Sequence, residues 1–117
     1  MASSSSDTPA LAWTTALDRY HEACAAERAY DQLVWSPASE MAALEGEGTP
    51  SDVDTEMERL QDARCDAEDA MVEVPAPDVG AVITKIEAYR RRWDGFEWSD
   101  DQWGPILADL HRLAGEG

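Results

Sequence analysis

The residues best suited to chemistry lie on one predicted helix near the N-terminus. His21 and Cys24 stand three positions apart, so their side chains share a helix face, and Asp18 lies one turn earlier. A metal site would need at least one further ligand, such as Cys65 from a facing helix. A histidine at the edge of the core beside a small buried thiol explains the same spacing without a metal. We therefore predict no metal and no cofactor.

Signatures of catalysis are lacking in the sequence. It contains no glycine-rich phosphate loop, no His-Glu-x-x-His, no Cys-x-x-Cys and no nucleophile elbow. Asp52, Asp54 and Glu56 alternate as calcium ligands do, but the glycine and the twelve-residue geometry of an EF-hand are missing. We predict that the protein is not an enzyme.

Carboxylates dominate the stretch Thr49–Val74, which the sequence predicts to be one amphipathic helix. Nine acids and two bases lie between positions 52 and 73. At ~1.5 Å rise per residue this stretch spans roughly 33 Å, with one carboxylate per ~3.7 Å. The phosphates of one DNA strand repeat every ~3.4 Å, so the linear charge resembles that of a nucleic-acid strand. The predicted partner contacts are Asp62, Asp66, Asp69 and Glu73, at i, i+4, i+7 and i+11, with Glu56, Glu58 and Glu68 flanking them.

The other side of this helix is apolar and needs a partner helix. Val53, Met57, Leu60, Ala67, Met71 and Val74 follow a 4-3 spacing, interrupted only by Arg64. A preceding helix, starting at Thr8-Pro9, carries Glu27 in the middle of its own apolar face. We predict that Glu27 and Arg64 form an inter-helix ion pair that sets the register of the two helices.

The positions of proline, glycine and capping residues predict the fold. Residues 1–8 form a flexible tail and 9–117 a single domain, in which 9–74 is a hairpin that turns at Gly46-Glu47-Gly48. Ser36-Pro37 should kink or restart its first helix. Two shorter helices occupy 78–114, capped by Asp78 and by Ser99 with Gln102. The predicted class is all-α: a long acidic antiparallel helical hairpin with two shorter C-terminal helices packed across it.

The apolar faces of the two shorter helices follow from the helical period. The first consists of Val79, Val82, Ile83, Ile86, Tyr89 and Trp93, and the second of Trp103, Ile106, Leu107, Leu110 and Leu113. Trp35 lies at the predicted helix break with less obvious cover. It either packs beneath the kink or joins Met41 and Leu44 in an apolar contact patch.

The net charge of −16, from 25 acids and 9 bases, is uneven along the chain. Residues 1–78 hold 18 acids and 4 bases (−14), whereas 79–117 hold 7 acids and 5 bases (−2). Nucleic acids and anionic membranes are repelled, and a basic protein surface is attracted. Solubility alone is the other explanation for the acidity. With no signal peptide and no apolar run of membrane-spanning length, we expect a cytoplasmic location.

Asp66-Ala67-Glu68-Asp69-Ala70, followed by Pro75-Ala76-Pro77-Asp78 and an apolar helix with Lys85, supports a resemblance. Over residues 12–92 the chain resembles a loose group of short, uncharacterised helical bacterial proteins that often lie near prophage-like or other mobile genes. The resemblance implies a helical fold and a mobile-element setting. It implies no activity and no functional residues.

Taken together, these features predict a non-enzymatic protein-binding module. It would act as an inhibitor that occupies a basic, nucleic-acid-binding surface of another protein, in the manner of a DNA mimic of the anti-CRISPR or anti-restriction type. The alternative is a structural or assembly protein that forms a homodimer through its hairpin, with acidity serving only solubility.

Overall fold

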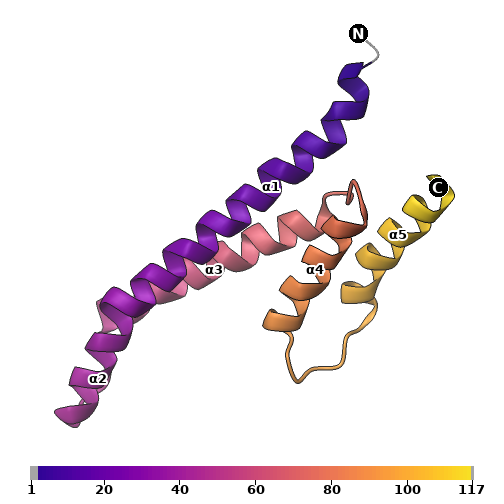
Figure 1. Ribbon diagram of the computed structural model, residues 1–117. Helices are drawn as coiled ribbons and strands as arrows, with labels where there is room; N and C mark the ends of the chain where they lie inside the picture. Colours follow the sequence, from indigo (N-terminus) through magenta and orange to yellow (C-terminus); the bar gives the residue numbers. More distant parts are fainter. Residues whose placement is uncertain (1–2, 117) are drawn as a thin grey trace. The chain divides into compact units, whose positions relative to one another are not determined.

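The computed structural model describes residues 3–116, and every regular element in that stretch is helical (Figure 1). The elements are α1 (Ser3–Tyr30), a π-helical turn η1 (Asp31–Trp35), α2 (Ser36–Leu44), α3 (Ser51–Glu73), α4 (Val79–Arg92) and α5 (Asp100–Glu116). The predicted all-α class is confirmed for this part of the chain. None of the described helices combines the length and the apolar character needed to cross a membrane.

The first three elements follow one another without a break. Helix α1 begins at Ser3, so part of the predicted flexible tail is helical and Pro9 lies inside the helix. A proline at this position cannot donate the hydrogen bond that a regular helix residue would donate. The interruption predicted at Ser36-Pro37 takes the form of η1, in which Ser36 N donates to the Asp31 carbonyl. This wider turn precedes Pro37, whose ring would collide with the carbonyl four residues back in a regular α-helix.

Glycines and capping side chains end and begin the remaining helices where the sequence predicts. Gly46 after α2 and Gly95 after α4 have φ of 74° and 82°, the left-handed region that glycine adopts without strain. Asp78 Oδ1 accepts a hydrogen bond of 2.8 Å from Ala81 N at the start of α4. Before α5, Ser99 N donates to Gln102 Oε1 at 2.9 Å, which completes a capping box.

The chain divides into two compact units. Unit 2 comprises Asp18–Ala67, and unit 1 comprises the chain up to Leu17 and from Glu68 onward. The boundaries therefore fall inside α1 and inside α3. Within unit 1, α4 and α5 pack against each other (Figure 1).

Polar contacts join the two halves of unit 2. Arg64 Nε lies 2.6 and 2.8 Å from the two carboxylate oxygens of Glu27. The Trp35 indole N–H donates to Asp54 Oδ1 at 2.9 Å. The hydroxyls of Ser39 and Thr49 lie 2.8 Å apart. The separation in sequence between the two partners falls from 37 positions in the first pair to 19 in the second and 10 in the third.

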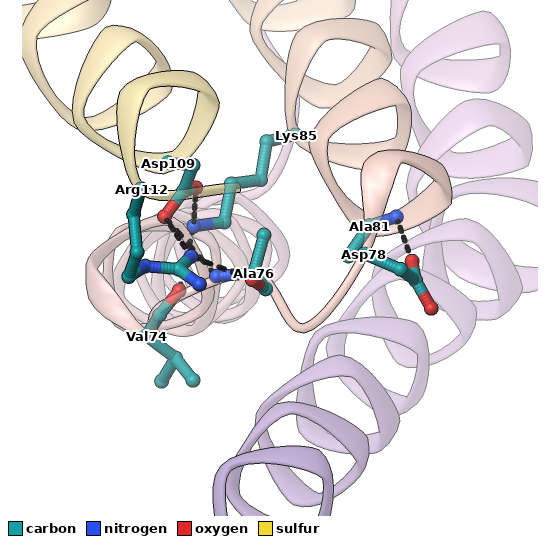
Figure 2. A network of polar contacts seen from close by, with 7 residues as sticks. All are labelled: Val74, Ala76, Asp78, Ala81, Lys85, Asp109 and Arg112. Carbon is teal, nitrogen blue, oxygen red and sulfur yellow. Dashed lines mark hydrogen bonds and ion pairs between the residues drawn. The ribbon is translucent and has the colours of Figure 1, made fainter. Parts of the chain in front are cut away.

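Unit 1 has an apolar core with a charged network beside it. The buried apolar side chains include Trp13, Met71, Val72, Val82, Tyr89 and Ile106. Next to them, the Lys85 ammonium donates to Asp109 Oδ2 and to the Val74 carbonyl, both at 2.6 Å (Figure 2). Arg112 donates to Asp109 Oδ1 at 3.0 Å and to the Ala76 carbonyl at 2.6 Å, and Ala76 N donates to the same Asp109 oxygen at 3.1 Å. The network fastens the linker after α3 to both α4 and α5.

Because of this network, the side of α5 that faces inward differs from the apolar face that the sequence predicts. Asp109 is 5% exposed because its carboxylate must reach Lys85, and Ile106 shares that inner side. Successive helix residues are about 100° apart, so this orientation turns three of the predicted core residues outward. These residues are Trp103, Leu107 and Leu110, and on α4 the predicted core residues Val79 and Ile83 are exposed as well.

Candidate functional site

A hollow of about 470 Å³ lies in unit 2, with η1 and α3 supplying its lining. The lining residues are Asp31, Trp35, Asp54, Met57, Glu58 and Gln61. Three carboxylates thus stand around an indole and a thioether, and the lining includes no lysine or arginine. This combination of negative charge and apolar surface distinguishes the hollow from an ordinary solvated acidic surface.

The local helix geometry explains why these side chains meet. On α3, Asp54, Glu58 and Gln61 are spaced at i, i+4 and i+7, so they share one face. On η1, Asp31 and Trp35 are four positions apart in a turn whose hydrogen bonds close from i to i+5, so they also lie about one turn apart. Single π-helical turns inside α-helices frequently occur at functional sites.

Neutral donors hold two of the three carboxylates in place. Trp35 Nε1 donates to Asp54 Oδ1 at 2.9 Å, and Ser36 Oγ donates to Asp31 Oδ1 at 2.8 Å. An indole N–H and a hydroxyl orient a carboxylate without cancelling its charge. Each carboxylate keeps an oxygen that can accept a hydrogen bond from a ligand. Glu58 is exposed.

The electrostatics beside the hollow are those of an acidic surface. Partial burial raises the pKa of the Tyr30 phenol, and the nearby charges of Glu56 and Asp52 raise it further. Hydrogen bonding from Arg59 lowers the pKa of Glu56, so this carboxylate is paired within its own helix. The predicted flanking contact Glu56 is therefore less available to a partner than Glu58.

The structure divides the predicted stripe of α3 between the two units. Asp62 and Asp66 are exposed in unit 2, and Glu73 is exposed in unit 1. Asp69 Oδ1 lies 2.6 Å from Arg92 Nη1, so an arginine of the same unit offsets its charge. Glu68, one of the predicted flanking contacts, is 1% exposed and accepts a hydrogen bond of 2.9 Å from Arg92. Its position on the inner side of unit 1 removes it from the partner contacts.

Of the three residues in the predicted apolar patch, Trp35, Met41 and Leu44, only Trp35 lines the hollow. Met41 and Leu44 are 58% and 84% exposed. Trp35 instead belongs to the hollow, which neither of the other two lines, and its indole N–H is held by Asp54. The structure does bring together Glu27 and Arg64, whose side chains are 15% and 26% exposed.

Metal chemistry receives no support from the described residues. No three of their His, Cys, Asp and Glu side chains are grouped so that they could hold a metal ion. Cys24 and Cys65 are free thiols, both partly buried.

A further cluster of titratable groups is the Lys85–Asp109–Arg112 network of unit 1, and its role is structural. Burial lowers the pKa of Lys85, while the hydrogen bond and charge of Asp109 act in the opposite direction. Among the described residues, no buried side-chain nitrogen or oxygen lacks a hydrogen-bond partner. The hydrogen bonds of the network run between α4, α5 and the linker after α3, which is a structural role.

Sequence reasoning named Glu58 as a partner contact and Trp35 as a possible apolar contact, but it did not join them in one site. Met57 was placed on the apolar stripe of its helix, Asp54 was noted for its alternation with other acids, and Asp31 and Gln61 were not singled out. The one available signal was the break in helical spacing before Pro37, which indicates a local distortion of the helix.

Comparison of the chain with protein-family models, with curated proteins and with solved structures finds no match.

Proposed function

We propose that this protein is a non-enzymatic binding module whose acidic hollow in unit 2 receives an arginine or lysine side chain from a basic protein partner. The observation that carries the proposal is the lining itself: three carboxylates around an indole and a thioether, with no cation of its own. Carboxylates bind a guanidinium or ammonium through charge-assisted hydrogen bonds. An indole adds a cation–π attraction, which is stronger where water is excluded.

Arginine fits the hollow better than lysine. Its planar guanidinium has five donors spread over a fork, so it can donate to more than one carboxylate at once. Its plane can also stack on an indole, whereas an ammonium is a compact and strongly hydrated point charge. Asp62 and Asp66, exposed on the following turns of α3, would guide further basic groups towards the hollow.

The fold proposed for this role is an antiparallel helical hairpin, with η1 and the hollow on it. Its support is the order of the polar pairs in unit 2, from Glu27 with Arg64 to Ser39 with Thr49. A basic partner surface that normally binds nucleic acid would be occupied by this acidic hairpin, which is how an anti-CRISPR or anti-restriction inhibitor would act. Inhibition would follow from competition for the same arginines, with no reaction required.

The test is calorimetric titration of the protein with an arginine-rich peptide and with its lysine-substituted counterpart. The triple variant Asp31→Asn/Asp54→Asn/Glu58→Gln keeps the shape of the hollow and removes its charge. We expect it to weaken arginine-peptide binding by about tenfold or more, because hydrogen bonds to charged groups contribute about 1.5–3 kcal/mol each. The arginine peptide should bind more tightly than the lysine peptide.

The matched control removes the same number of charges elsewhere in unit 2. Glu40, Glu45 and Glu47 are all exposed and lie outside the hollow. Glu40→Gln/Glu45→Gln/Glu47→Gln should weaken binding only slightly, through the general field. Equal losses in the two triple variants would show that net charge alone attracts the peptide, and the proposed site would be wrong.

A further inference from the structure

Helix α5 exposes a continuous apolar stripe in unit 1. Trp103, Leu107 and Leu110 are 43%, 47% and 40% exposed, and their spacing of i, i+4 and i+7 places them on one face. Ala114, one further turn along, is also exposed. No ionisable residue occupies these four positions.

This exposure is unusual because the helix has turned a carboxylate inward and its larger apolar side chains outward. Asp109 and Ile106 are the buried residues of α5, at 5% and 1% exposure. Single exposed apolar side chains are common, but a contiguous stripe of them marks an interaction surface. On the neighbouring helix α4, Val79 and Ile83 are also exposed, at 57% and 50%.

The distribution of charge favours a second copy of the chain as the occupant. Residues 1–78 carry a net charge of −14, so surfaces from that part of two copies repel each other. Residues 79–117 carry only −2, and the stripe itself has no charge. A basic partner would be drawn to the acidic surfaces, whereas an uncharged apolar stripe complements its own copy.

The stripe also suits a two-fold axis. In an isologous dimer the same patch meets itself, so antiparallel α5 helices would place Leu107 close to Leu107 of the other copy and Trp103 opposite Leu110. At the ends of the stripe, the exposed Asp100 of one helix would approach the exposed His111 of the other. An imidazole N–H can donate to a carboxylate, so the rim is complementary as well.

We propose that the protein forms a symmetric homodimer through the outer face of α5, with its two α5 helices antiparallel across the axis. The area of a few apolar side chains per copy is small for an interface, so the dimer is weak, in the micromolar range. The proposal is independent of the acidic hollow, because every residue it uses lies in unit 1. A dimer would nevertheless present two hollows, and binding to a repeated basic partner would gain from avidity.

Sedimentation across micromolar to millimolar concentrations is the first test. The intact protein should show a monomer–dimer equilibrium, and Leu107→Ser/Leu110→Ser should weaken it by about tenfold or more, at roughly 1.4 kcal/mol per factor of ten. Leu11→Ser is the matched control, because Leu11 is an exposed leucine of unit 1 outside the stripe, at 67% exposure. Persistence of the monomer at every concentration, or equal dimerisation of the double variant, would overturn the proposal.

Oxidative cross-linking supplies a second readout that does not depend on how the double variant folds. In a background with Cys24→Ala and Cys65→Ala, Leu107→Cys should form a disulfide-linked dimer, because residues near a two-fold axis meet their own copies. Leu11→Cys in the same background should remain uncross-linked. Equal cross-linking of the two variants would refute the antiparallel α5 contact. If the intact protein dimerises but does not bind the arginine peptide, the acidic hollow is refuted and the dimer is not.

Discussion

Lys85 and Asp109 illustrate how a buried ion pair can organise backbone as well as side chains. Lys85 is 0% exposed, and its ammonium donates hydrogen bonds to Asp109 and to the Val74 carbonyl. The Asp109 carboxylate also accepts a hydrogen bond from Ala76 N. Two charges taken out of water gain little net stability from each other. Here they also satisfy the backbone groups of a linker that proline keeps out of a helix.

The variant Lys85→Met should destabilise the protein by about 3–5 kcal/mol, although it replaces a buried cation with an apolar side chain of similar length. The change leaves the Asp109 carboxylate short of one partner and the Val74 carbonyl without its donor, and breaking a buried pair from one side costs about this much. Urea unfolding followed by circular dichroism measures the effect. A change smaller than about 1 kcal/mol would mean that Arg112 alone can satisfy Asp109.

The pH dependence of stability provides a second signature of Lys85. Burial lowers its pKa below 10.5, so between the lowered pKa and 10.5 the folded protein has lost a proton that the unfolded chain still holds. Unfolding then takes up a proton, and the free energy of unfolding rises with pH in this window. Burial raises the pKa of Tyr89 above 10.0, which gives the opposite slope as pH passes that value. Tyr30, whose pKa is also raised, acts in the same direction as Tyr89. In a Tyr30→Phe/Tyr89→Phe background the rise should be visible, and Lys85→Met should abolish it.

Glu27 and Arg64 call for a double-mutant cycle. Arg64→Met alone should be destabilising by about 1–3 kcal/mol, because it leaves a carboxylate that is 15% exposed without its principal partner. Adding Glu27→Leu should recover most of that loss, since two apolar side chains replace two desolvated charges. Thermal or urea unfolding of the four proteins gives the coupling energy. Simple additivity would show that the pair does not set the register of unit 2.

At the scale of elements, η1 is the feature on which the hollow depends. A π-helical turn contains one residue more than a regular helical turn, and the side chain of Leu33 within it is 77% exposed. Deleting Leu33 together with Pro37→Ala, which removes the ring that a regular α-helix cannot accommodate, should convert the turn to α-helix with little loss of burial, so helix content and urea midpoint should be preserved. Asp31 and Trp35 would then lose their relative placement, and binding of the arginine peptide should fall by about tenfold. Retained affinity in a folded deletion variant would show that the π turn is incidental to binding.

The helix ends were predictable from the sequence, whereas the orientation of α5 and the hollow were not. Asp78 and the Ser99–Gln102 box act within one turn, so local sequence contains all the information they need. The inward side of α5 depends on a lysine 24 positions earlier, and apolar residues occur on both sides of the helix. The hollow requires η1 and α3 to meet in one register, which no local pattern specifies. Lys85 was noted only in the stretch that supports the family resemblance, and its burial needed Asp109 as a partner.

For the whole molecule, the net charge of −16 should make stability and binding respond to salt in opposite directions. The screening length falls from about 30 Å at 0.01 M salt to about 10 Å at 0.1 M, which reduces the repulsion among the many carboxylates. The urea midpoint should therefore rise with sodium chloride. Affinity for the arginine peptide should fall over the same range, mainly through slower association. Sodium chloride, compared with a non-ionic osmolyte such as sucrose, separates screening from general stabilisation: sucrose should raise the midpoint without weakening the peptide complex. A peptide affinity indifferent to salt would place the recognition on apolar contacts and remove the electrostatic basis of the hollow.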